Sequence, residues 1–273
     1  MAKLLHVSDI HFGPKHLRRL SEAVLELAHA GRPDLVVVSG DLTQRAKPYQ
    51  FREARAWLDR LPTPVSFVPG NHDVPMFRFW ERFLSPFDAW TRNLAPELVR
   101  GYRDGELAVA GLNTAHAWTS KHGRVTAAEI AGVERELQAA HGVAARVVVA
   151  HHPLAGGERL GREPVARGGL AALERIARAG ADLVLSGHLH HGFWLRPFGA
   201  DGPLVAHAGT TTSSRGRGAE AGRNSLNWIE LETGAVRLER RLWNPVAGRF
   251  EVEEAIELPR RAPVDAPPLA PVS

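Results

Sequence analysis

Apolar and polar positions follow two different patterns along the chain, one typical of strands and one typical of helices. Strand-length apolar runs are followed by stretches with helical periodicity, and this alternation continues to about residue 186. The predicted strands span residues 3–8, 35–39, 65–68, 107–112, 146–150 and 183–186, and the predicted helices span residues 17–30, 51–61, a segment beginning near Thr126, and 169–179. Continuous apolar strands joined by helices are typical of sheets that are buried on both faces. The pattern therefore predicts an α/β fold.

The pattern of predicted elements changes at residue 193. Strand-like segments then follow one another without an intervening helix, at residues 193–197, 204–208, 227–231, 236–242 and 250–258. They predict antiparallel strands that complete the first sheet or add a second one. A chain of 273 residues suits one well-buried domain, so residues 1–258 are interpreted as a single domain and residues 259–273, with five prolines, as a loose tail.

One segment breaks the alternation of strands and helices. Residues 76–94 carry six aromatic side chains, which are Phe77, Phe79, Trp80, Phe83, Phe87 and Trp90. Large aromatic side chains are usually buried, which favours a pair of helices packed on the core. Because the segment directly follows polar residues at 71–73, a cap over a site or a dimerisation surface is the second interpretation.

The composition limits which chemistry is available. The chain has no cysteine, which excludes a disulfide, a thiolate zinc site and a cysteine nucleophile, so any metal must be held by His, Asp, Glu or Asn. Its 34 basic and 30 acidic residues give a net charge of only +4, and the arginines are scattered, so nucleic acid is not expected as a partner. The start of the sequence lacks a leader-peptide pattern and no apolar run is long enough to span a membrane, so a cytoplasmic protein is expected.

Ligand-type residues follow five of the predicted strands. They stand in the segments SDIH, SGDL, PGNHD, AHHP and SGHLHH, and they are Asp9, His11, Asp41, Asn71, His72, Asp73, His151, His152, His188, His190 and His191. Ligands gather beyond the carboxyl ends of strands in open α/β sheets, so these side chains are predicted to share one rim. Each fragment alone has an ordinary explanation as a turn or a surface histidine. Their occurrence together, in this order, is the informative signal.

Spacing and glycines strengthen this interpretation. In the D-x-H and H-x-H segments the two side chains are two residues apart, and such residues point the same way in an extended chain. Gly40, Gly70 and Gly187 each precede a ligand-type residue, where the backbone must turn sharply or approach another segment closely.

The ordered series D-x-H, G-D, G-N-H-D, H and G-H-x-H resembles the calcineurin-like metallophosphoesterase superfamily over residues 3–232. The resemblance implies a β-sandwich flanked by helices, in αββα layers, with the ligands on loops at one end. It implies the following ligand set: Asp9, His11 and His190 for one metal, Asn71, His151 and His188 for the other, and Asp41 as the bridge. His151 is preferred to His152 because the family's ligand is usually the first histidine of such a pair.

Mixed imidazole, carboxylate and amide ligands suit Mn, Fe, Co or Zn, so two such divalent or trivalent ions are the predicted cofactors. A water bridging the two ions would lose a proton and attack phosphorus in line, as expected of a phosphoesterase. His72, adjacent to a ligand, is expected to stabilise the phosphoryl charge or protonate the leaving oxygen, and orienting a ligand is the alternative. For Asp73, orientation of His72 and capping of the turn both stay open.

The substrate class rests on the resemblance alone. Segments such as VVSGDLTQ, SGHLHHG and HAGTTTSSRGRG are similar to those of bacterial class III cyclic-nucleotide phosphodiesterases. This similarity implies hydrolysis of a small phosphodiester, first of all a 3',5'-cyclic nucleotide of the cAMP type. Arg215 and Arg217 are candidates for binding its phosphate or base, with solvent-exposed loop arginines as the alternative. The alternative functions are another phosphodiesterase, a nucleotide pyrophosphatase, a metal-dependent nuclease and, last, an inactive scaffold, while relatives suggest a homodimer.

Overall fold

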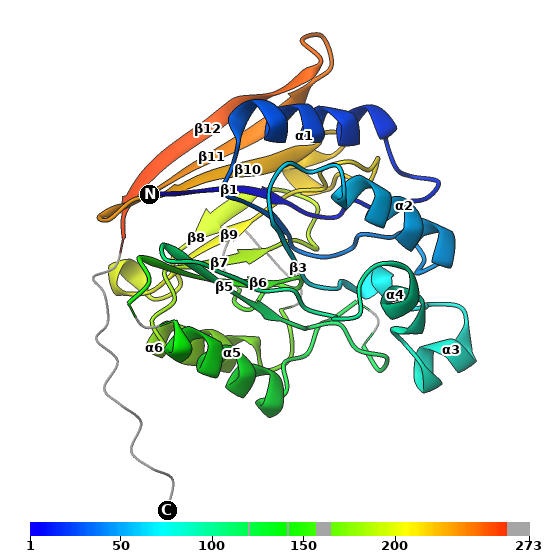
Figure 1. Cartoon of the computed structure of the whole chain (residues 1–273), viewed down its shortest axis with the longest axis horizontal. Helices are drawn as coiled ribbons and strands as arrows, with labels where there is room; N and C mark the ends of the chain where they lie inside the picture. Colours follow the sequence, from blue (N-terminus) through cyan, green and yellow to red (C-terminus); the bar gives the residue numbers. More distant parts are fainter. Residues whose placement is uncertain (120, 141, 157–164, 261–273) are drawn as a thin grey trace, which may run out of the picture.

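Two β-sheets lie face to face, and helices cover the outer face of each (Figure 1). The computed structural model describes residues 1–119, 121–140, 142–156 and 165–260. The first sheet has the order β12-β11-β10-β1-β2-β3 and contains β1 (Ala2–Val7), β2 (Leu35–Val38), β3 (Val65–Phe67), β10 (Ser225–Leu231), β11 (Ala235–Asn244) and β12 (Arg249–Pro259). The second has the order β4-β5-β6-β7-β9-β8 and contains β4 (Tyr102–Arg103), β5 (Leu107–Leu112), β6 (Ala145–Ala150), β7 (Leu183–Ser186), β8 (Phe193–Leu195) and β9 (Leu204–His207).

Strand direction changes where the sequence pattern changes, near residue 193. Up to residue 186, β1, β2 and β3 run parallel, as do β5, β6 and β7. The antiparallel prediction for the second half is confirmed for β10, β11 and β12 and for the pairing of β8 with β9. It is wrong for β9 beside β7, because β9 pairs in parallel with that strand. The second half therefore completes both sheets.

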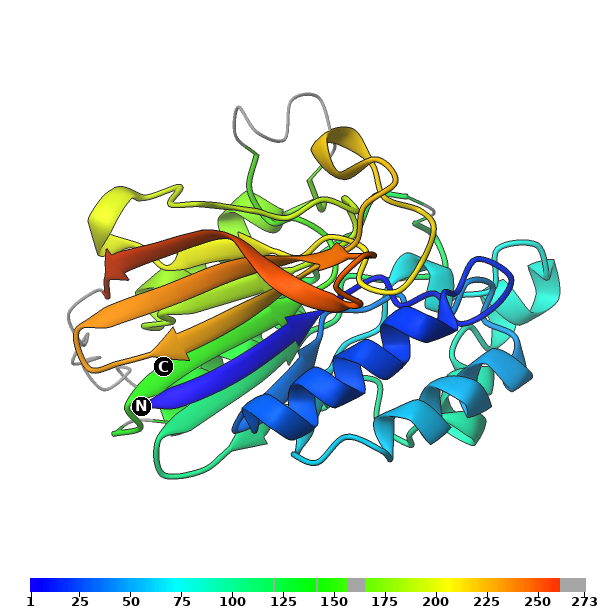
Figure 2. The same ribbon diagram turned by 90° about the horizontal axis from the view of Figure 1, so that it is seen from above.

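Four helices make the outer layers. They are α1 (Arg18–Gly31) and α2 (Pro48–Leu58) over the first sheet, and α5 (Ala127–Ala139) and α6 (Gly169–Arg178) over the second. Seen from above, α1 and α2 run side by side (Figure 2), and the indole of Trp57 donates to the carbonyl of Ser21 at 3.1 Å between them. Thr126 caps α5, since its backbone N–H donates to Glu129 at 2.8 Å and its hydroxyl accepts from the Glu129 N–H. The αββα arrangement is confirmed.

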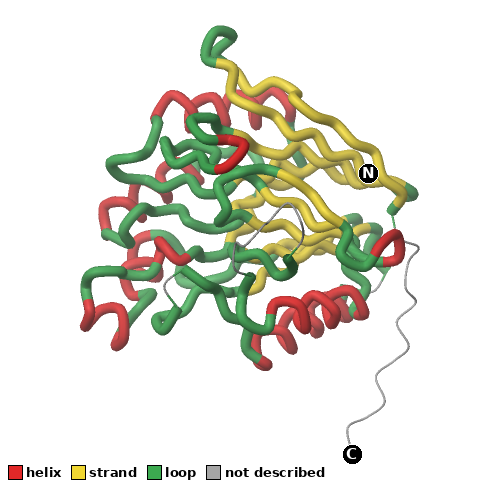
Figure 3. The backbone as a smooth tube through the Cα atoms, turned by 180° about the vertical axis from the view of Figure 1, so that it is seen from behind, coloured by secondary structure: helices red, strands yellow, loops and turns green. Residues whose placement is uncertain are grey.

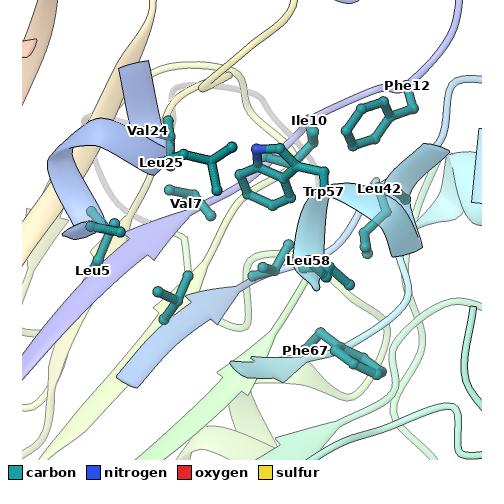
Figure 4. Close-up of a cluster of buried hydrophobic side chains, with 14 of the residues drawn as sticks. Leu5, Val7, Ile10, Phe12, Val24, Leu25, Leu42, Trp57, Leu58 and Phe67 are labelled. Carbon is teal, nitrogen blue, oxygen red and sulfur yellow. The ribbon is translucent and has the colours of Figure 1, made fainter. Parts of the chain in front are cut away.

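The continuous apolar runs have a direct explanation in these layers. Successive side chains of a strand point to opposite faces, so a strand with a core on each face needs no polar position. In β1, Leu5 and Val7 belong to the same buried cluster as Trp57, under α1 and α2 (Figure 4), whereas Leu4 belongs to the cluster between the two sheets. The same alternation holds along β2, where Val36 faces the helices.

The aromatic segment divides into two parts. The short helix α4 (Asp88–Asn93) places Trp90 in the core, against the rings of Phe51 and Phe67. The short helix α3 (Phe79–Leu84) instead leaves Trp80 exposed, together with other apolar side chains at residues 77, 79 and 84. The core interpretation is thus confirmed for Trp90 and wrong for the α3 half, for which a cap or a dimerisation surface stays a prediction.

The end of β12 is held to the rest of the fold. Arg260, the last described residue, donates from Nε to Oδ1 of Asp182 at 2.9 Å. Most of the predicted loose tail, residues 261–273, lies outside the described residues. None of the described helices combines the length and the apolar composition that a membrane span requires.

Candidate metal centre

The predicted ligands lie on loops that follow the carboxyl ends of parallel strands, at the end of the sheets where loops gather (Figure 3). Asp9 and His11 follow β1, Asp41 follows β2, Asn71 begins a short 3₁₀ turn (Asn71–Asp73) after β3, His151 follows β6, and His188 and His190 follow β7. Neighbouring parallel strands end at the same edge, so five separate loops deliver their side chains to one place. The predicted shared rim is confirmed.

The backbone at these residues is unusual. Seven described non-glycine residues have a positive φ, and five of them are predicted ligands: Asp9 (52°), His11 (54°), Asp41 (54°), His188 (71°) and His190 (61°). Residues with a Cβ rarely adopt this left-handed conformation, which costs free energy and concentrates at functional sites. The surrounding contacts must therefore hold these five residues in place.

The glycines allow the loops to approach one another. A Cβ at Gly70 would lie 2.1 Å from Oδ1 of Asp41, and a Cβ at Gly187 would lie 1.8 Å from Oγ of Ser8 and 2.7 Å from Oδ2 of Asp9. Neither position has room for a side chain. The close approach predicted from the position of these glycines is confirmed.

A first group of donors surrounds Asp9. Its Oδ1 lies 3.0 Å from Nε2 of His190, and Nε2 of His11 lies 3.3 Å from the same nitrogen. The other ring nitrogens face carbonyl oxygens: Nδ1 of His190 lies 2.7 Å from that of Arg215, and Nδ1 of His11 lies 3.4 Å from that of Thr43. A carbonyl only accepts, so Nδ1 carries the proton in both rings. The two Nε2 lone pairs therefore point at each other, an arrangement that a shared cation would stabilise.

A second group of donors surrounds Asn71. Its Oδ1 lies 3.0 Å from Nδ1 of His188 and 3.3 Å from Nε2 of His151. Nδ1 of His151 faces the Ser39 carbonyl at 2.7 Å, which leaves the Nε2 lone pair directed at the group. Asp41 contacts both groups, because its Oδ1 lies 3.4 Å from His151 and its Oδ2 lies 3.7 Å from Nε2 of His11 in the first group. A carboxylate in this position has the geometry of a bridge.

His152 lies close to the second group but has different contacts. Its Nδ1 lies 2.8 Å from Oγ1 of Thr114, and its ring centroid lies 4.6 Å from that of His188. Its buried Nε2 has no hydrogen-bond partner among the described residues. Each of His151, His152 and His188 offers one ring nitrogen, and these three nitrogens lie within 4.8 Å of one another. The preference for His151 as ligand stays a prediction, supported by its contact with Asp41.

The carboxylates of the centre are buried and ionised. Burial raises the pKa of Asp9, but the neighbouring histidines, His190 first, outweigh it and hold the pKa well below its usual range. Burial also raises the pKa of Asp41, but the neighbouring histidines, His151 first, outweigh it and hold this pKa well below its usual range. Oδ1 of Asp9 and Oδ2 of Asp41 are nevertheless buried without a hydrogen bond in the described structure. Buried charged oxygens need a partner, and a metal ion is such a partner.

The histidines differ in their protonation. Burial lowers the pKa of His11 to about 4 and that of His188 to about 3, so both are neutral at pH 7, as ligands must be. Burial also lowers the pKa of His151, but the adjacent Asp41 carboxylate outweighs it and raises that pKa to about 9. His151 would therefore have to release a proton in order to hold a metal ion. The combination of imidazole, carboxylate and amide donors fits transition-metal ions.

His72 lies beside the metal donors without joining them. Its backbone N–H donates to Oδ1 of Asp41 at 2.8 Å, and its ring packs edge-on against His11 at 4.9 Å between centroids. Its Nδ1 lies 2.9 Å from the carbonyl oxygen of Gln44, and Nη1 of Arg215 lies 3.0 Å from its Nε2. The structure thus brings Arg215 to the centre. Arg217 is exposed, and its backbone N–H donates to the carbonyl of His190 at 3.2 Å.

Asp73 ties two loops together. Its carboxylate accepts from the backbone N–H groups of Leu42, Thr43 and Gly70 at 3.1, 2.8 and 2.9 Å, and from the Thr43 hydroxyl at 2.9 Å. Burial and the charge of Asp41 raise its pKa to about 7. These contacts favour the capping role over orientation of His72. Thr43 and Arg45 were not singled out from the sequence, although both stand within a few residues of Asp41 in the segment GDLTQR.

Two curated relatives are similar to parts of the chain. A glycerophosphodiester phosphodiesterase of Enterobacter lignolyticus is 34% identical over 80 residues, which cover 26% of this chain and 29% of the relative. A cAMP/cGMP dual specificity phosphodiesterase of Mycobacterium tuberculosis is 28% identical over 208 residues, which cover 69% of this chain and 61% of the relative. The chain thus spans less than two thirds of the length of either relative.

Solved structures agree on the fold. A purple acid phosphatase from yellow lupin superposes on all of this chain and on 57% of its own, with a TM-score of 0.72 and 13% sequence identity. At that identity the likeness concerns the fold alone. The family model described as calcineurin-like phosphoesterase matches residues 2–192, which carry every predicted metal ligand. This chain therefore belongs to the calcineurin-like phosphoesterase family.

Proposed function

We propose that this protein hydrolyses a small phosphodiester at a dinuclear metal centre, and that a 3',5'-cyclic nucleotide such as cAMP is its substrate. The observation that carries the proposal is the position of Asp41, whose two carboxylate oxygens face two separate groups of donors. Two adjacent ions clamp the attacking and leaving oxygens of a phosphoryl transfer, which one ion does less well. The substrate class is supported by the cAMP/cGMP phosphodiesterase relative, whose similarity covers 69% of the chain.

Seven side chains would hold the two ions. The first site would use Asp9, His11 and His190, the second would use Asn71, His151 and His188, and Asp41 would bridge them. Ions of Mn, Fe, Co or Zn bound there would act as Lewis acids toward the phosphoryl oxygens and the attacking water.

Arg215 and His72 supply the charge beside this site. The Nε2 atom of His72 accepts from the guanidinium, so the neutral ring carries no proton on the nitrogen that faces Arg215. Charge stabilisation through Arg215 is therefore the role that the geometry supports for this pair. The guanidinium would donate to a phosphoryl oxygen, and His72 would keep it in position.

A glycerophosphodiester is the second candidate substrate. The relative named for that activity matches this chain over 26% of its length, a shorter region than the cyclic-nucleotide phosphodiesterase matches. Both candidates are diesters and use the same centre. Comparing the hydrolysis of cAMP with that of glycerophosphoethanolamine separates them.

The test begins with protein stripped of metal by a chelator and resupplied with Mn. Hydrolysis of bis-p-nitrophenyl phosphate and of p-nitrophenyl phosphate is compared, followed by cAMP, cGMP and glycerophosphoethanolamine. We expect metal-dependent turnover of the diester and of cAMP, and no turnover by the Asn71→Ala variant. A preference for the monoester would overturn the diesterase assignment, and a preference for glycerophosphoethanolamine would replace the cyclic nucleotide as substrate.

A further inference from the structure

Arg45 and Phe77 form a stacked pair outside the metal centre. The guanidinium carbon of Arg45 lies 4.7 Å from the centroid of the Phe77 ring. Phe77 remains 75% exposed, so most of its ring faces solvent although one face carries the arginine. The guanidinium is attracted to the ring face by a cation–π interaction, which helps to hold the ring in this orientation.

The loop at residues 41–46 connects this pair to the centre. It begins at the bridging ligand Asp41 and contacts the His72 ring through the carbonyl of Gln44, one residue before Arg45. The backbone N–H of Arg45 donates to Oε1 of Gln50 at 2.9 Å, which fixes the loop on α2. On the other side, Nη2 of Arg78 donates to the carbonyl of Ala46 at 2.6 Å and so fixes the turn that carries Phe77. Hydrogen bonds therefore hold both segments that form the stacked pair, the loop with Arg45 and the turn with Phe77.

Positive charge also collects on this side of the centre. Burial lowers the pKa of Arg215, and the nearby charges of Arg217 and Arg45 lower it further. No described acidic side chain forms an ion pair with any of these three arginines. The acidic groups that offset them, Asp41 and Asp9, are the ones that face the metal donors. Like charges held together in this way favour an anionic ligand beside Arg215.

We propose that Arg45 and Phe77 form the base subsite of a nucleotide-binding site. The phosphate of the nucleotide would lie between the metal donors and Arg215, and the planar base would stack on the exposed face of the Phe77 ring. Aromatic rings bind any nucleobase by its π-face, so this subsite would select for a base without reading which base it is. The inference rests on the proposed function in taking the ligand to be a nucleotide.

The test is a calorimetric titration of the Mn-loaded protein with AMP and, separately, with ribose 5-phosphate, which has the sugar and phosphate but no base. We expect AMP to bind at least about five-fold more tightly than ribose 5-phosphate, which is the lower end of what one stacked base contributes. The Phe77→Ala variant should lose this preference. Because Phe77 is exposed, its truncation leaves the core intact, and an unchanged thermal midpoint would show this.

Phe79→Ala is the matched control. Phe79 is 63% exposed on the same segment, but its ring contacts Trp80 and Phe83 rather than Arg45. This variant should keep the preference of the wild type for AMP. The proposal is overturned if wild-type protein binds AMP no more tightly than ribose 5-phosphate, including no binding of either, or if Phe77→Ala retains the preference. A protein that prefers AMP but does not hydrolyse cAMP would overturn the proposed substrate and keep the subsite.

Discussion

Arg215 donates from Nη1 to Nε2 of His72 at 3.0 Å, while Nδ1 of the same ring lies 2.9 Å from the carbonyl oxygen of Gln44. The carbonyl can only accept, so the proton sits on Nδ1 and the lone pair of Nε2 holds the guanidinium. Burial lowers the pKa of His72, and Arg215 lowers it further against the opposing charge of Asp41. A neutral imidazole thus fixes a permanent positive charge beside the metal donors.

This contact predicts that Arg215 and His72 act as one unit. Arg215→Ala should lower kcat on bis-p-nitrophenyl phosphate by about 100-fold, the usual cost of removing one donor to a developing charge. His72→Ala should lower it by a similar or smaller factor, since the arginine then loses its position. The double variant should be little worse than Arg215→Ala alone, because each single change disrupts the same contact. Losses that multiply in the double variant would show that the two side chains act independently.

Asn71 tests the second group of metal donors. Its Oδ1 atom lies 3.0 Å from His188 and 3.3 Å from His151, on a loop outside the sheets. Asn71→Ala should therefore lower kcat by at least about 100-fold, beyond the usual effect of removing a residue that only supports a ligand. The thermal midpoint of the metal-free protein should change by no more than a few degrees. Asn93→Ala, on the helix α4, is the control and should retain activity. Wild-type turnover by Asn71→Ala would remove this residue from the site.

Metal removal should lower stability as well as activity. The carboxylates of Asp9 and Asp41 are buried with oxygens that have no hydrogen bond in the described structure, and a bound cation would stabilise them. At a free Mn concentration of 100 times the dissociation constant, each ion adds about 2.7 kcal/mol to the free energy of unfolding. Scanning calorimetry of chelated and Mn-resupplied protein should show a midpoint that rises with Mn and stays constant with Mg. Identical midpoints with and without Mn would argue against the site.

The ordered motifs allowed the metal donors to be predicted from the sequence, because each stands at the end of an apolar strand and the fold brings those ends together. The His72–Arg215 contact could not be predicted, since its members lie 143 positions apart and the segment at residues 208–224, between β9 and β10, carries no periodicity. The left-handed backbone of residues such as Asp9 was equally hidden. Only glycine, and to a lesser degree asparagine, indicates that conformation in a sequence.

The fold was predictable where local pattern decides it and not where distant packing does. Leu4 and Leu5 are both apolar because each faces a different core, which a continuous run signals directly. Trp80 and Trp90 stand in one aromatic segment, yet the first is exposed and the second is buried between Phe51 and Phe67. Their difference depends on which core residues lie under α4, and the segment itself contains no sign of it.

A pH-dependent contact lies at the start of α5, away from the metal donors. Nε2 of His116 is 3.3 Å from Oε1 of Glu129, the residue that also completes the capping box with Thr126. The hydrogen bond to Glu129 raises the pKa of His116 above 6.5. Burial raises the pKa of Glu129, but hydrogen bonds from His116 and Thr126 outweigh it and lower the pKa below 4.5. Both shifts favour the ion pair.

The two shifts define the pH range in which the pair stabilises the fold. A raised histidine pKa contributes stability below about pH 6.5, its unfolded value, and loses it as the pH rises through the folded pKa. A lowered carboxyl pKa contributes above about pH 4.5 and loses it in acid. His116→Gln should therefore reduce the free energy of unfolding by about 0.5–1 kcal/mol near pH 5.5 and by less at pH 9. Urea unfolding at both pH values measures this, with the exposed His122→Gln as control. A difference between wild type and His116→Gln that stays constant, or grows, from pH 5.5 to pH 9 would contradict the assignment.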